Sequence, residues 1–553
     1  MVGAPARRFR LDGRTEEAPA GQTVLAALAR DRVPVLQRSI RYHRPRAPFC
    51  GLGYCTGCLV RVNGRPNVRA CRHVPAEGDR IATENSWPSP RFDVYGALDF
   101  LFPRGVDTLH GFRRPAWATG LYQRVVRRLG GFGAVPDEVA DPGPLPPAVR
   151  RSVDVAIVGG GTSGSAAARR LAGAGVATVV LDRTLPPPVL PGVELLGRTT
   201  VGFLPPRSAA TEPFVLLAST EDGAGIEVRA RSVIVASGGY DGSLLFAGND
   251  RPGIVTADAA LGLAGASGTP PFRHAVVVGG GERAAEVLRA LGHRVESVVA
   301  PGPIAPSLAR SASELDVPLY PRTLVLGATG RSRVRRLRLR SRGAGTPFHL
   351  DCDAVVLAHR RLPSAQLLFQ AGARMAWRGG VGAYFPVVGP AGDTSVPGLF
   401  AVGAVAGSPG EDAATSGERA ADALRGRPPA GAGPGPVAAE GPPELEGYYR
   451  ELLSGPRRGR WIACPCEDVL LEEIEAANRA GYRGIEVVKR YSGVGTGLCQ
   501  GRYCLPDTLL LLAILEGRTP PEVGYITQRP PVVPARLGAL AALADPPATP
   551  EAR

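Results

Sequence analysis

The stretch VDVAIVGGGTSGSAAARRLAGAGVATVVLDR, residues 153–183, decides the fold that this chain of 553 residues is expected to adopt. An apolar run leads into a glycine turn, an alanine-rich segment follows, and a second apolar run ends in Asp182. Gly159, Gly161 and Gly164 give the pattern G-x-G-x-x-G, which suits a tight turn, a close backbone approach to a pyrophosphate and close packing of helix on strand. Asp182 stands where a carboxylate can accept hydrogen bonds from ribose hydroxyls. The stretch therefore predicts a dinucleotide-binding Rossmann unit, with a purely structural Rossmann unit as the alternative.

A second stretch, HAVVVGGGERAAEVLRALGHRVESVVAPG at residues 274–302, repeats this pattern incompletely. Gly279 and Gly281 occupy the first two glycine positions, but Ala284 stands at the third. No acid closes the second apolar run, and Glu296 comes too early to serve. Two interpretations remain open: a site for NAD(P) or another adenine nucleotide, and a degenerate structural domain.

The first cysteine group has the spacing C-x4-C-x2-C-x12-C and begins in CGLGYCTGC, residues 50–58. Four thiolates can hold a tetrahedral zinc or the two irons of a 2Fe–2S cluster, but this spacing is the plant-type 2Fe–2S arrangement, whereas zinc sites usually use two C-x2-C pairs. Glycines 51, 53 and 57 allow backbone N–H groups to point at the sulfur atoms. We expect a 2Fe–2S cluster, with zinc or free structural thiols as alternatives. The expected ligands are Cys50, Cys55, Cys58 and Cys71.

The second cysteine group, in WIACPCEDVLLEEIEAANRAGYRGIEVVKRYSGVGTGLCQGRYC at residues 461–504, has a C-x-C pair followed by a C-x4-C pair. C-x-C is rare for zinc, so a second 2Fe–2S cluster is expected, with zinc as the alternative. Lys489, Arg490 and Arg502 either offset the negative charge of this cluster or form solvated surface. The expected ligands are Cys464, Cys466, Cys499 and Cys504; Cys352 stands alone and is interpreted as a small buried hydrophobic residue.

The composition excludes several classes of function. The formal charge of +15 comes almost entirely from arginines scattered along the chain, and no basic run interleaves with aromatic residues, so nucleic-acid binding is not expected. No apolar run reaches the ~18 residues of a membrane span, and no apolar segment follows the basic residues near residue 1. A cytoplasmic location is expected, where thiols stay reduced and grouped cysteines bind metal.

Four segments resemble the α subunits of heteromeric amino-acid dehydrogenases and oxidases, the family of sarcosine oxidase, opine oxidase, hydroxyproline or proline dehydrogenase and hydrogen cyanide synthase. Residues 7–85 resemble their ferredoxin-type module, and residues 461–504 their bacterioferritin-associated-ferredoxin-like module. SVIVASGGYDG, which contains Gly238, and SVPGLFAVGAVAGSPG, which contains Gly403, resemble the two later turns of their flavin domain. The resemblance implies FAD, two 2Fe–2S clusters, and Gly238 and Gly403 as cofactor-binding residues.

The resemblance also implies a fold class: an α/β two-dinucleotide-domain, disulfide-reductase-like flavoprotein fold, flanked by an α+β ferredoxin-like domain and a small, mainly helical 2Fe–2S domain. Proline-rich and low-complexity stretches predict linkers between them. The expected domains are a ferredoxin-like domain (1–95), a linker (96–150), an FAD-binding Rossmann-like domain in two segments (151–271 and 353–425), an inserted second nucleotide-binding-like domain (272–352), a linker (426–445), and a bacterioferritin-associated-ferredoxin-like domain with an extended tail (446–553).

Two departures from the family pattern concern the flavin site. The family's late turn reads Gly-Asp, whereas this chain has Gly403-Ala404, and the loss of one hydrogen bond weakens cofactor binding by about 1–3 kcal/mol. The glycine-rich segment and helix that normally follow the acid of the second strand are also missing after Asp182.

The expected function is electron transfer within a heteromeric amino-acid, imino-acid or amine dehydrogenase, because clusters carry single electrons and a flavin can split a hydride's pair. No catalytic residue is identified, since no general base or nucleophile stands out and the seven histidines show no metal or triad spacing. The resemblance implies an FAD-dependent β subunit of the amino-acid-oxidase type as partner, and an electron acceptor. The alternatives are a self-contained NAD(P)H-dependent reductase and a cluster-bearing scaffold with a vestigial nucleotide site.

Overall fold

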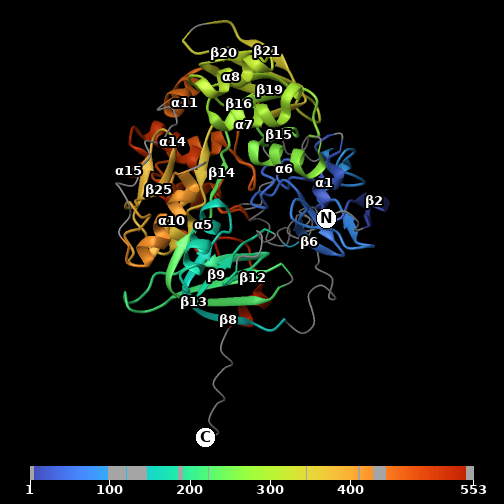
Figure 1. Ribbon diagram of the computed structural model, residues 1–553. Coiled ribbons are helices and arrows are strands. Elements are labelled where there is room, and N and C mark those ends of the chain that lie inside the picture. The colour runs from blue at the N-terminus through green and yellow to red at the C-terminus, as the bar shows by residue number, and fades with distance from the viewer. Residues whose placement is uncertain are drawn as a thin grey trace. The chain divides into compact units, whose positions relative to one another are not determined.

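The computed structural model describes residues 5–30, 32–97, 120, 146–184, 191–221, 223–268, 270–343, 345–408, 412–427 and 444–543. The chain divides into two compact units (Figure 1). The first unit consists of residues 1–141, 241–360 and 444–524, and the second of residues 142–240, 361–443 and 525–553. Most of the predicted linkers at 96–150 and 426–445 lies outside the described residues.

The second unit is built on a seven-stranded sheet with the order β10-β9-β8-β13-β12-β11, in which β26 also pairs with β13. The pairs β10–β9, β9–β8, β8–β13 and β13–β26 are parallel, and β11, β12 and β13 pair antiparallel. The four residues of β9 are all buried, as expected for a parallel strand covered on both faces. The elements are β8 (Val149–Val158), α5 (Thr162–Ala172), β9 (Thr178–Leu181), β10 (Val193–Leu196), β11 (Thr199–Phe203), β12 (Phe214–Thr220), β13 (Gly225–Val235), β14 (Gly239–Asp241), β23 (Arg361–Pro363), α9 (Gln366–Gln370), β24 (Met375–Arg378), β25 (Ala383–Pro386), β26 (Leu399–Ala401), the 3-10 helix η3 (Gly403–Val405), α10 (Asp412–Leu424) and α16 (Leu537–Ala541).

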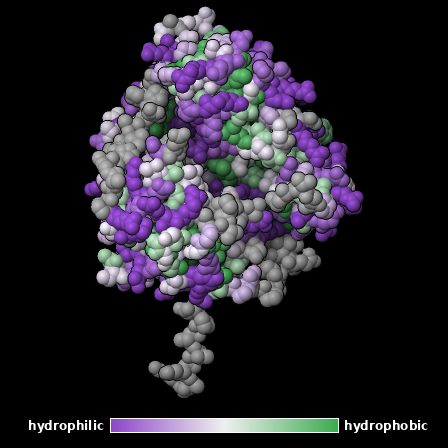
Figure 2. Space-filling model, viewed as in Figure 1, coloured by the Kyte–Doolittle hydropathy of each residue, from purple (hydrophilic) through white to green (hydrophobic). Residues whose placement is uncertain are grey.

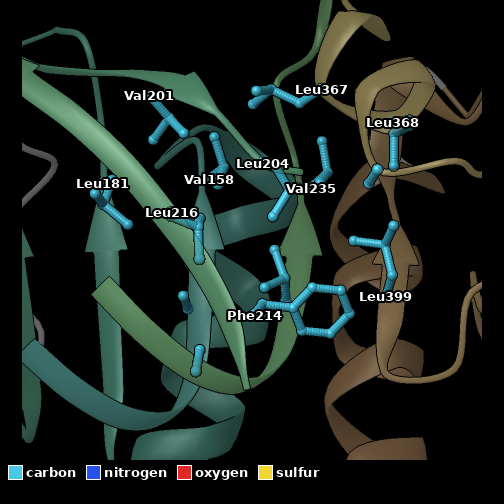
Figure 3. Packing of buried hydrophobic residues seen from close by; sticks show 14 of the residues in the cluster. Val158, Leu181, Val201, Leu204, Phe214, Leu216, Val235, Leu367, Leu368 and Leu399 are labelled. Atoms are coloured by element: carbon cyan, nitrogen blue, oxygen red, sulfur yellow. The ribbon is translucent and has the colours of Figure 1, made fainter. Parts of the chain in front are cut away.

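Both faces of this sheet carry a hydrophobic core, because side chains alternate between the faces along each strand. On one face, Ile157 of β8 packs with Leu171 of α5 and with α10, which lies beside α5 (Figure 1). On the other face, Val158 joins Phe214 and Leu216 of β12 and residues of α9 (Figure 3). The carboxyl end of β8, where the first glycine turn begins, is thereby held from both sides.

The tail after residue 524 differs from the prediction, which made it an extended segment. Val532 joins the core beside β12, and the short helix α16 packs against β12 and β13. The backbone N–H of Val532 also donates to the carbonyl of Gly202, 3.0 Å away. Residues 525–536 form no helix or strand, but the packing of the tail and the helix α16 were not predicted, because the tail has few apolar residues and their partners lie far away in the sequence.

The amino-terminal module of the first unit has a five-stranded sheet with the order β2-β1-β7-β5-β6. Asn63 and Gly64, both with positive φ, form the turn between β5 and β6, and Asn-Gly is a pair that favours such a hairpin turn. Phe9, Leu25 and Val60 form part of the core. The elements are β1 (Arg7–Leu11), β2 (Arg14–Ala18), α1 (Val24–Leu28), β3 (Gln37–Arg38), β4 (Pro45–Arg46), β5 (Leu59–Val62), β6 (Arg65–Arg69), β7 (Arg80–Ala82) and the 3-10 helix η1 (Val94–Ala97).

The inserted module of the first unit has a parallel sheet with the order β15-β22-β16-β17-β18 and an antiparallel sheet of β19, β20 and β21. Residues 254–267 and 354–357 were predicted to belong to the flavin domain. However, β15 and β22 pair with each other, and β22 pairs with β16, so both segments pack with the inserted module. The elements are β15 (Ile254–Thr256), α6 (Ala257–Ser267), β16 (Ala275–Val278), α7 (Glu282–Leu291), the 3-10 helix η2 (Gly292–Arg294), β17 (Val295–Val299), α8 (Pro306–Glu314), β18 (Leu319–Tyr320), β19 (Thr323–Thr329), β20 (Arg336–Ser341), β21 (Phe348–Asp351) and β22 (Ala354–Leu357).

The carboxyl-terminal module of the first unit is mainly helical. Its central helix is buried along its first nine residues, which is the pattern of a helix inside a core. The elements are α11 (Glu444–Ser454), β27 (Ile462–Cys464), β28 (Val469–Leu470), α12 (Leu471–Arg479), α13 (Ile485–Ser492), α14 (Leu505–Glu516) and α15 (Pro520–Val523). In the part of the chain that the structure describes, no helix combines the length and the apolar character that crossing a membrane requires. The face seen in Figure 2 is covered mostly by hydrophilic residues, with small scattered hydrophobic patches.

Candidate functional site

The four cysteines of the first group lie together, buried in the amino-terminal module. Their exposed fractions are 0% for Cys50, 6% for Cys55, 2% for Cys58 and 8% for Cys71. The thiols form two hydrogen-bonded pairs, Cys50 with Cys55 and Cys58 with Cys71. A 2Fe–2S cluster, in which two ligands serve each iron, requires such an arrangement of two adjacent pairs.

Backbone N–H groups of the loop donate to these sulfur atoms. The N–H of Cys55 lies 3.4 Å from the Sγ of Cys50, and the N–H of Gly57 lies 3.4 Å from the Sγ of Cys55. A Cβ at Gly57 would lie 2.2 Å from the carbonyl oxygen of Ala47, so only glycine fits there. Burial raises the pKa of the Cys50 thiol, but hydrogen bonds from Cys55 and from backbone N–H groups outweigh it and lower this pKa to about 5. The loop therefore stabilises a thiolate, the form that binds iron.

The second cysteine group is arranged in the same way in the carboxyl-terminal module. Cys466 pairs with Cys499, and Cys464 pairs with Cys504. A hydrogen bond from Cys499 lowers the pKa of Cys466 to about 7 against the effect of burial, and the hydroxyl of Thr56 and the charge of Arg46 also lower it.

The pairing bears on the choice between a cluster and a single zinc ion. Among the described residues, no group of three or more His, Cys, Asp or Glu side chains converges closely enough to hold one metal ion. A tetrahedral zinc site requires four ligands around one point, whereas two pairs of thiols fit two bridged irons. The pairing of the thiols in both groups matches the two ligand pairs of a 2Fe–2S cluster.

The two cysteine groups are in contact with each other within the first unit. The hydroxyl of Thr56, between Cys55 and Cys58, hydrogen bonds to the sulfur of Cys466. Arg46 donates from Nη2 to the carbonyl of Cys466, 2.8 Å away, and from Nη1 to Oγ1 of Thr56, 3.4 Å away. Neither Thr56 nor Arg46 belongs to a spacing pattern, so the sequence alone does not predict this contact.

Aromatic and cationic side chains extend this contact. The guanidinium carbon of Arg502 lies 4.3 Å from the centre of the Tyr54 ring, and the rings of Phe49 and Tyr503 meet edge to face with their centroids 5.3 Å apart. Arg502 is therefore buried between the two loops instead of solvated. Lys489 pairs with Glu486 at 3.1 Å on α13.

A buried ion-pair network surrounds the contact. Arg44 binds Asp468 and, at 2.5 Å, Asp250, while Arg46 binds the same oxygen of Asp468 at 3.1 Å. Burial raises the pKa of Asp468, but the charges of Arg44 and Arg46 outweigh it and hold this pKa well below its usual range. The network joins all three modules of the first unit, because Asp250 belongs to the inserted module and Asp468 to the carboxyl-terminal one.

The first glycine turn in the second unit has the geometry of a pyrophosphate site. A Cβ at Gly159 would lie 2.3 Å from the carbonyl oxygen of Ala236, and one at Gly164 would lie 1.8 Å from the carbonyl oxygen of Gly159. In contrast, no atom lies within 4 Å of a Cβ placed at Gly161, the residue before α5. Two glycines thus allow the close packing, and the third faces open space at a helix amino terminus, where a phosphate is favoured.

The other predicted flavin-site residues lie around this turn. Asp182 follows β9 and accepts from the N–H groups of Gly160 and Thr184, both at 2.6 Å. Gly403 has φ +71° and begins η3, and its N–H donates to Oγ of Ser416 at 2.9 Å. The methyl group of Ala404 supplies no acceptor. The residues present therefore fit the nucleotide half of FAD, and they lack the usual carboxylate for the ribityl chain.

Arg378 is a residue near Gly403 that the sequence analysis missed. Its guanidinium lies 4.4 Å from the centre of the Phe385 ring, and a Cβ at Gly407 would lie 2.2 Å from its Nη1. Burial lowers the pKa of Arg378, which pairs with no carboxylate of the described residues. A half-buried cation from β24 thus lies against the late turn, beside Ala406 and Gly407.

The second glycine turn is less suited to a phosphate. Gly279 packs against Ala358, whereas Gly281 faces open space, as Gly161 does. However, Glu282 stands in the first turn of α7, where its carboxylate accepts from Arg289 at 2.6 Å. A fixed negative charge at this position opposes the binding of a pyrophosphate at the helix amino terminus.

Family models match three parts of the chain. Residues 6–86 match a 2Fe-2S iron-sulfur cluster binding domain, residues 207–424 match the pyridine nucleotide-disulphide oxidoreductase family, and residues 459–544 match the sarcosine oxidase A3 domain. These matches confirm the predicted disulfide-reductase-like flavoprotein fold with an amino-terminal 2Fe–2S domain.

Two curated relatives align with this chain over different fractions of their own length. Sarcosine oxidase subunit alpha of Rhizobium meliloti is 28% identical over 584 residues, which cover 96% of this chain and 57% of that protein. The hydrogen cyanide synthase subunit HcnA of Pseudomonas aeruginosa is 40% identical over 83 residues, which cover 15% of this chain and 75% of that protein. The chain therefore spans little more than half the length of the sarcosine oxidase subunit.

A solved structure resembles nearly the whole chain. L-proline dehydrogenase from P. horikoshii superposes with a TM-score of 0.65 and 19% identity, covering 97% of this chain and 98% of that one. At this identity the similarity shows a shared fold.

Proposed function

Because this chain belongs to the family that contains sarcosine oxidase subunit alpha and the hydrogen cyanide synthase subunit HcnA, we propose that it is the electron-transfer subunit of a heteromeric dehydrogenase or oxidase. The substrate is an amino acid, an imino acid or a related amine. It loses its hydride in an FAD-dependent partner subunit of the amino-acid-oxidase type, and the electrons leave through this chain to an acceptor.

The contact between the two cysteine groups carries this proposal. Thr56 of one group hydrogen bonds to Cys466 of the other, so two clusters held by these groups would be close neighbours. Bound FAD would accept or donate electrons in pairs and the 2Fe–2S clusters singly. The chain's own contribution is to hold the cysteines in pairs, all of them buried except the half-buried Cys466, to exclude water with Phe49 and Tyr503, and to donate N–H and O–H groups to the sulfur atoms.

The proposed ligands follow the two sets of pairs. They are Cys50, Cys55, Cys58 and Cys71 for the first cluster, and Cys464, Cys466, Cys499 and Cys504 for the second.

The proposed flavin site lies in the second unit. Gly159, Gly161 and Gly164 would receive the pyrophosphate, and Asp182 would exchange its bond to the Gly160 N–H for bonds to ribose. Gly238 and Gly403 would form the flavin side of the site.

The test is to purify the chain anaerobically from its native host and to measure iron, acid-labile sulfide, flavin and any co-purifying flavoprotein. The proposal predicts about four irons per chain and two electron paramagnetic resonance signals that broaden each other, since two clusters carry two irons each and lie close together. C58S should remove one signal and about half of the iron.

The matched control is Cys352, a buried cysteine outside both groups, whose pKa burial raises to about 12. C352A should retain all of the iron and both signals. Zinc in place of iron and sulfide, or equal loss of iron in C352A, would contradict the proposal.

A further inference from the structure

The first unit contains an open cavity that the proposed electron path does not use. Its volume is about 810 Å³, which lies within the range of small-molecule sites. All three modules of the unit contribute to its walls, through residues 38–45 of the amino-terminal module, 247–252 and 326–338 of the inserted module, and 458–472 of the carboxyl-terminal module.

The cavity lies away from the glycine turn of the inserted module. Strands β15, β22 and β16 are parallel, so their amino ends share one edge of the sheet. Residues 247–252 directly precede β15 at that edge, whereas Gly279 and Gly281 directly follow β16 at the opposite edge. The cavity is therefore distinct from the nucleotide site that the sequence pattern predicts.

The lining of the cavity is strongly positive. Seven of the lining side chains are arginines and two are acids, Asp250 and Glu472, so the formal charge of the lining is +5. Asp250 already forms an ion pair with Arg44 at 2.5 Å. Arginines held together at a cavity with so few acids raise the local concentration of anions.

Five of the seven arginines have no carboxylate partner within 4.0 Å among the described residues: Arg251, Arg331, Arg338, Arg458 and Arg460. Arg251 donates to the carbonyl of Ala328 at 3.0 Å, and the guanidinium carbon of Arg460 lies 4.5 Å from the centre of the Tyr42 ring. These contacts orient two of the cations without neutralising them. Arg331 and Arg458 are exposed at the cavity. Their guanidinium groups form no hydrogen bond or ion pair with a described residue.

We propose that this cavity binds a small molecule that carries two or more phosphate groups. Guanidinium groups match phosphate oxygens in a bidentate manner, and several of them around one cavity fit a ligand with several negative charges. The described lining contains no Phe or Trp, and Arg460 and Arg41 approach the Tyr42 ring at 4.5 and 5.1 Å. Recognition therefore depends on the phosphate groups and not on stacking of a base.

The position of the cavity gives the ligand a structural effect. Its walls belong to three modules, and two of them, the inserted and the carboxyl-terminal module, contribute the arginines that have no carboxylate partner among the described residues. A bound polyphosphate should therefore stabilise the first unit as a whole, and it should do so whether or not electrons pass through the clusters.

The test uses inorganic triphosphate, which has no base or sugar for a dinucleotide fold to recognise. It is titrated by calorimetry into the purified full-length protein with its cofactors, and thermal unfolding is followed in parallel. We expect one saturable site per chain, a higher unfolding temperature with triphosphate, and no competition by NADH. R331Q and R458Q should each weaken binding about tenfold, because each removes one bidentate phosphate contact.

The matched control is R335Q, which removes an exposed arginine from the same segment that does not line the cavity. It should bind triphosphate as the wild type does. Iron content and the unfolding temperature without ligand show whether each variant is folded. If R331Q does not fold, R458Q tests the same cavity.

Four results would overturn the proposal. These are the absence of saturable binding, equal affinity in the wild type and in both cavity variants, equal weakening in R335Q, and competition by NADH. Citrate or polyglutamate binding as tightly as triphosphate would overturn the assignment to phosphate, in favour of a carboxylate ligand or an acidic protein segment.

Discussion

The hydroxyl of Thr56 donates to the sulfur of Cys466 and helps to lower the pKa of that thiol. Donors to a ligand sulfur stabilise the reduced, more negative state of an iron–sulfur cluster and so raise its reduction potential. T56V keeps the shape of the side chain and removes the donor. The potential of the proposed carboxyl-terminal cluster should fall, as measured by a redox titration followed by paramagnetic resonance.

Thr496 provides a control in the same module. Its hydroxyl donates to the carbonyl of Gly493 at 2.7 Å and not to a cysteine. T496V should leave the potential unchanged, and an equal shift in both variants would show that the Thr56 hydroxyl has no specific effect on the cluster.

Gly161 and Gly164 are three residues apart but should respond differently to the same substitution. A Cβ at Gly164 would lie 1.8 Å from the carbonyl oxygen of Gly159, so G164A should cost about 1–3 kcal/mol or more through overpacking and lower the unfolding temperature. G161A meets no atom within 4 Å and should fold normally.

If the pyrophosphate of FAD approaches Gly161, then G161A should bind flavin more weakly at unchanged stability. The ratio of flavin to protein and the unfolding temperature of each variant measure the two effects separately. Full flavin content in G161A would place the cofactor elsewhere.

Strand β22 ends next to His359, a buried side chain whose protonation should limit stability in acid. Burial lowers the pKa of His359 well below its ordinary value, and the charge of Arg360 lowers it further. As the pH falls through about 6.5, the unfolded chain binds a proton at His359 and the folded chain does not. The free energy of unfolding should therefore decrease at pH values below about 6.5, by up to about 1.4 kcal/mol per pH unit.

H359Q removes this titrating group and should flatten the acid side of the stability profile. The difference in unfolding temperature between the wild type and H359Q should therefore change as the pH falls from 7.5 to 5.5. A constant difference over this range would mean that His359 titrates alike in both states.

Elements whose partners are close in sequence could be predicted, and elements whose partners are distant could not. The Asn63-Gly64 turn is determined by its own backbone conformation, and the turn before α5 by glycines that follow directly on β8. The packing of α16 depends instead on β12 and β13, more than 300 residues earlier, and a short apolar run does not indicate its partner. For the same reason β15 and β22 were assigned to the wrong sheet.

The three modules of the first unit are joined by Asp468, which binds both Arg44 and Arg46. D468N removes a buried charge and leaves two buried guanidinium groups short of a partner, so it should cost about 3–5 kcal/mol. We expect a lower unfolding temperature and faster proteolysis between the modules.

D351N is the matched control, because Asp351 forms an exposed pair with Arg336 at 2.6 Å and exposed pairs contribute little. It should leave the unfolding temperature unchanged. D250N should have an intermediate effect, since Arg44 keeps its bond to Asp468. Equal effects of all three variants would contradict the role given to Asp468.

The candidate site could be predicted in parts but not as a whole. Each cysteine group is a local spacing pattern, so the sequence could predict which thiols lie together. The contact between the groups could not, because Arg46 and Cys466 are separated by 420 positions and no pattern links them. Thr56, Arg46 and Arg378 each act through a neighbour that only the folded chain supplies.

The distance along the chain between Arg44 and Asp468 also affects how the protein is made. The two residues are 424 positions apart. At a ribosomal rate of about 5–20 residues per second, Asp468 is synthesised roughly 20–80 s after Arg44. Arg44, Arg46 and the first cysteine loop thus emerge long before the carboxyl-terminal residues that they contact, so the amino-terminal module can fold before this contact forms.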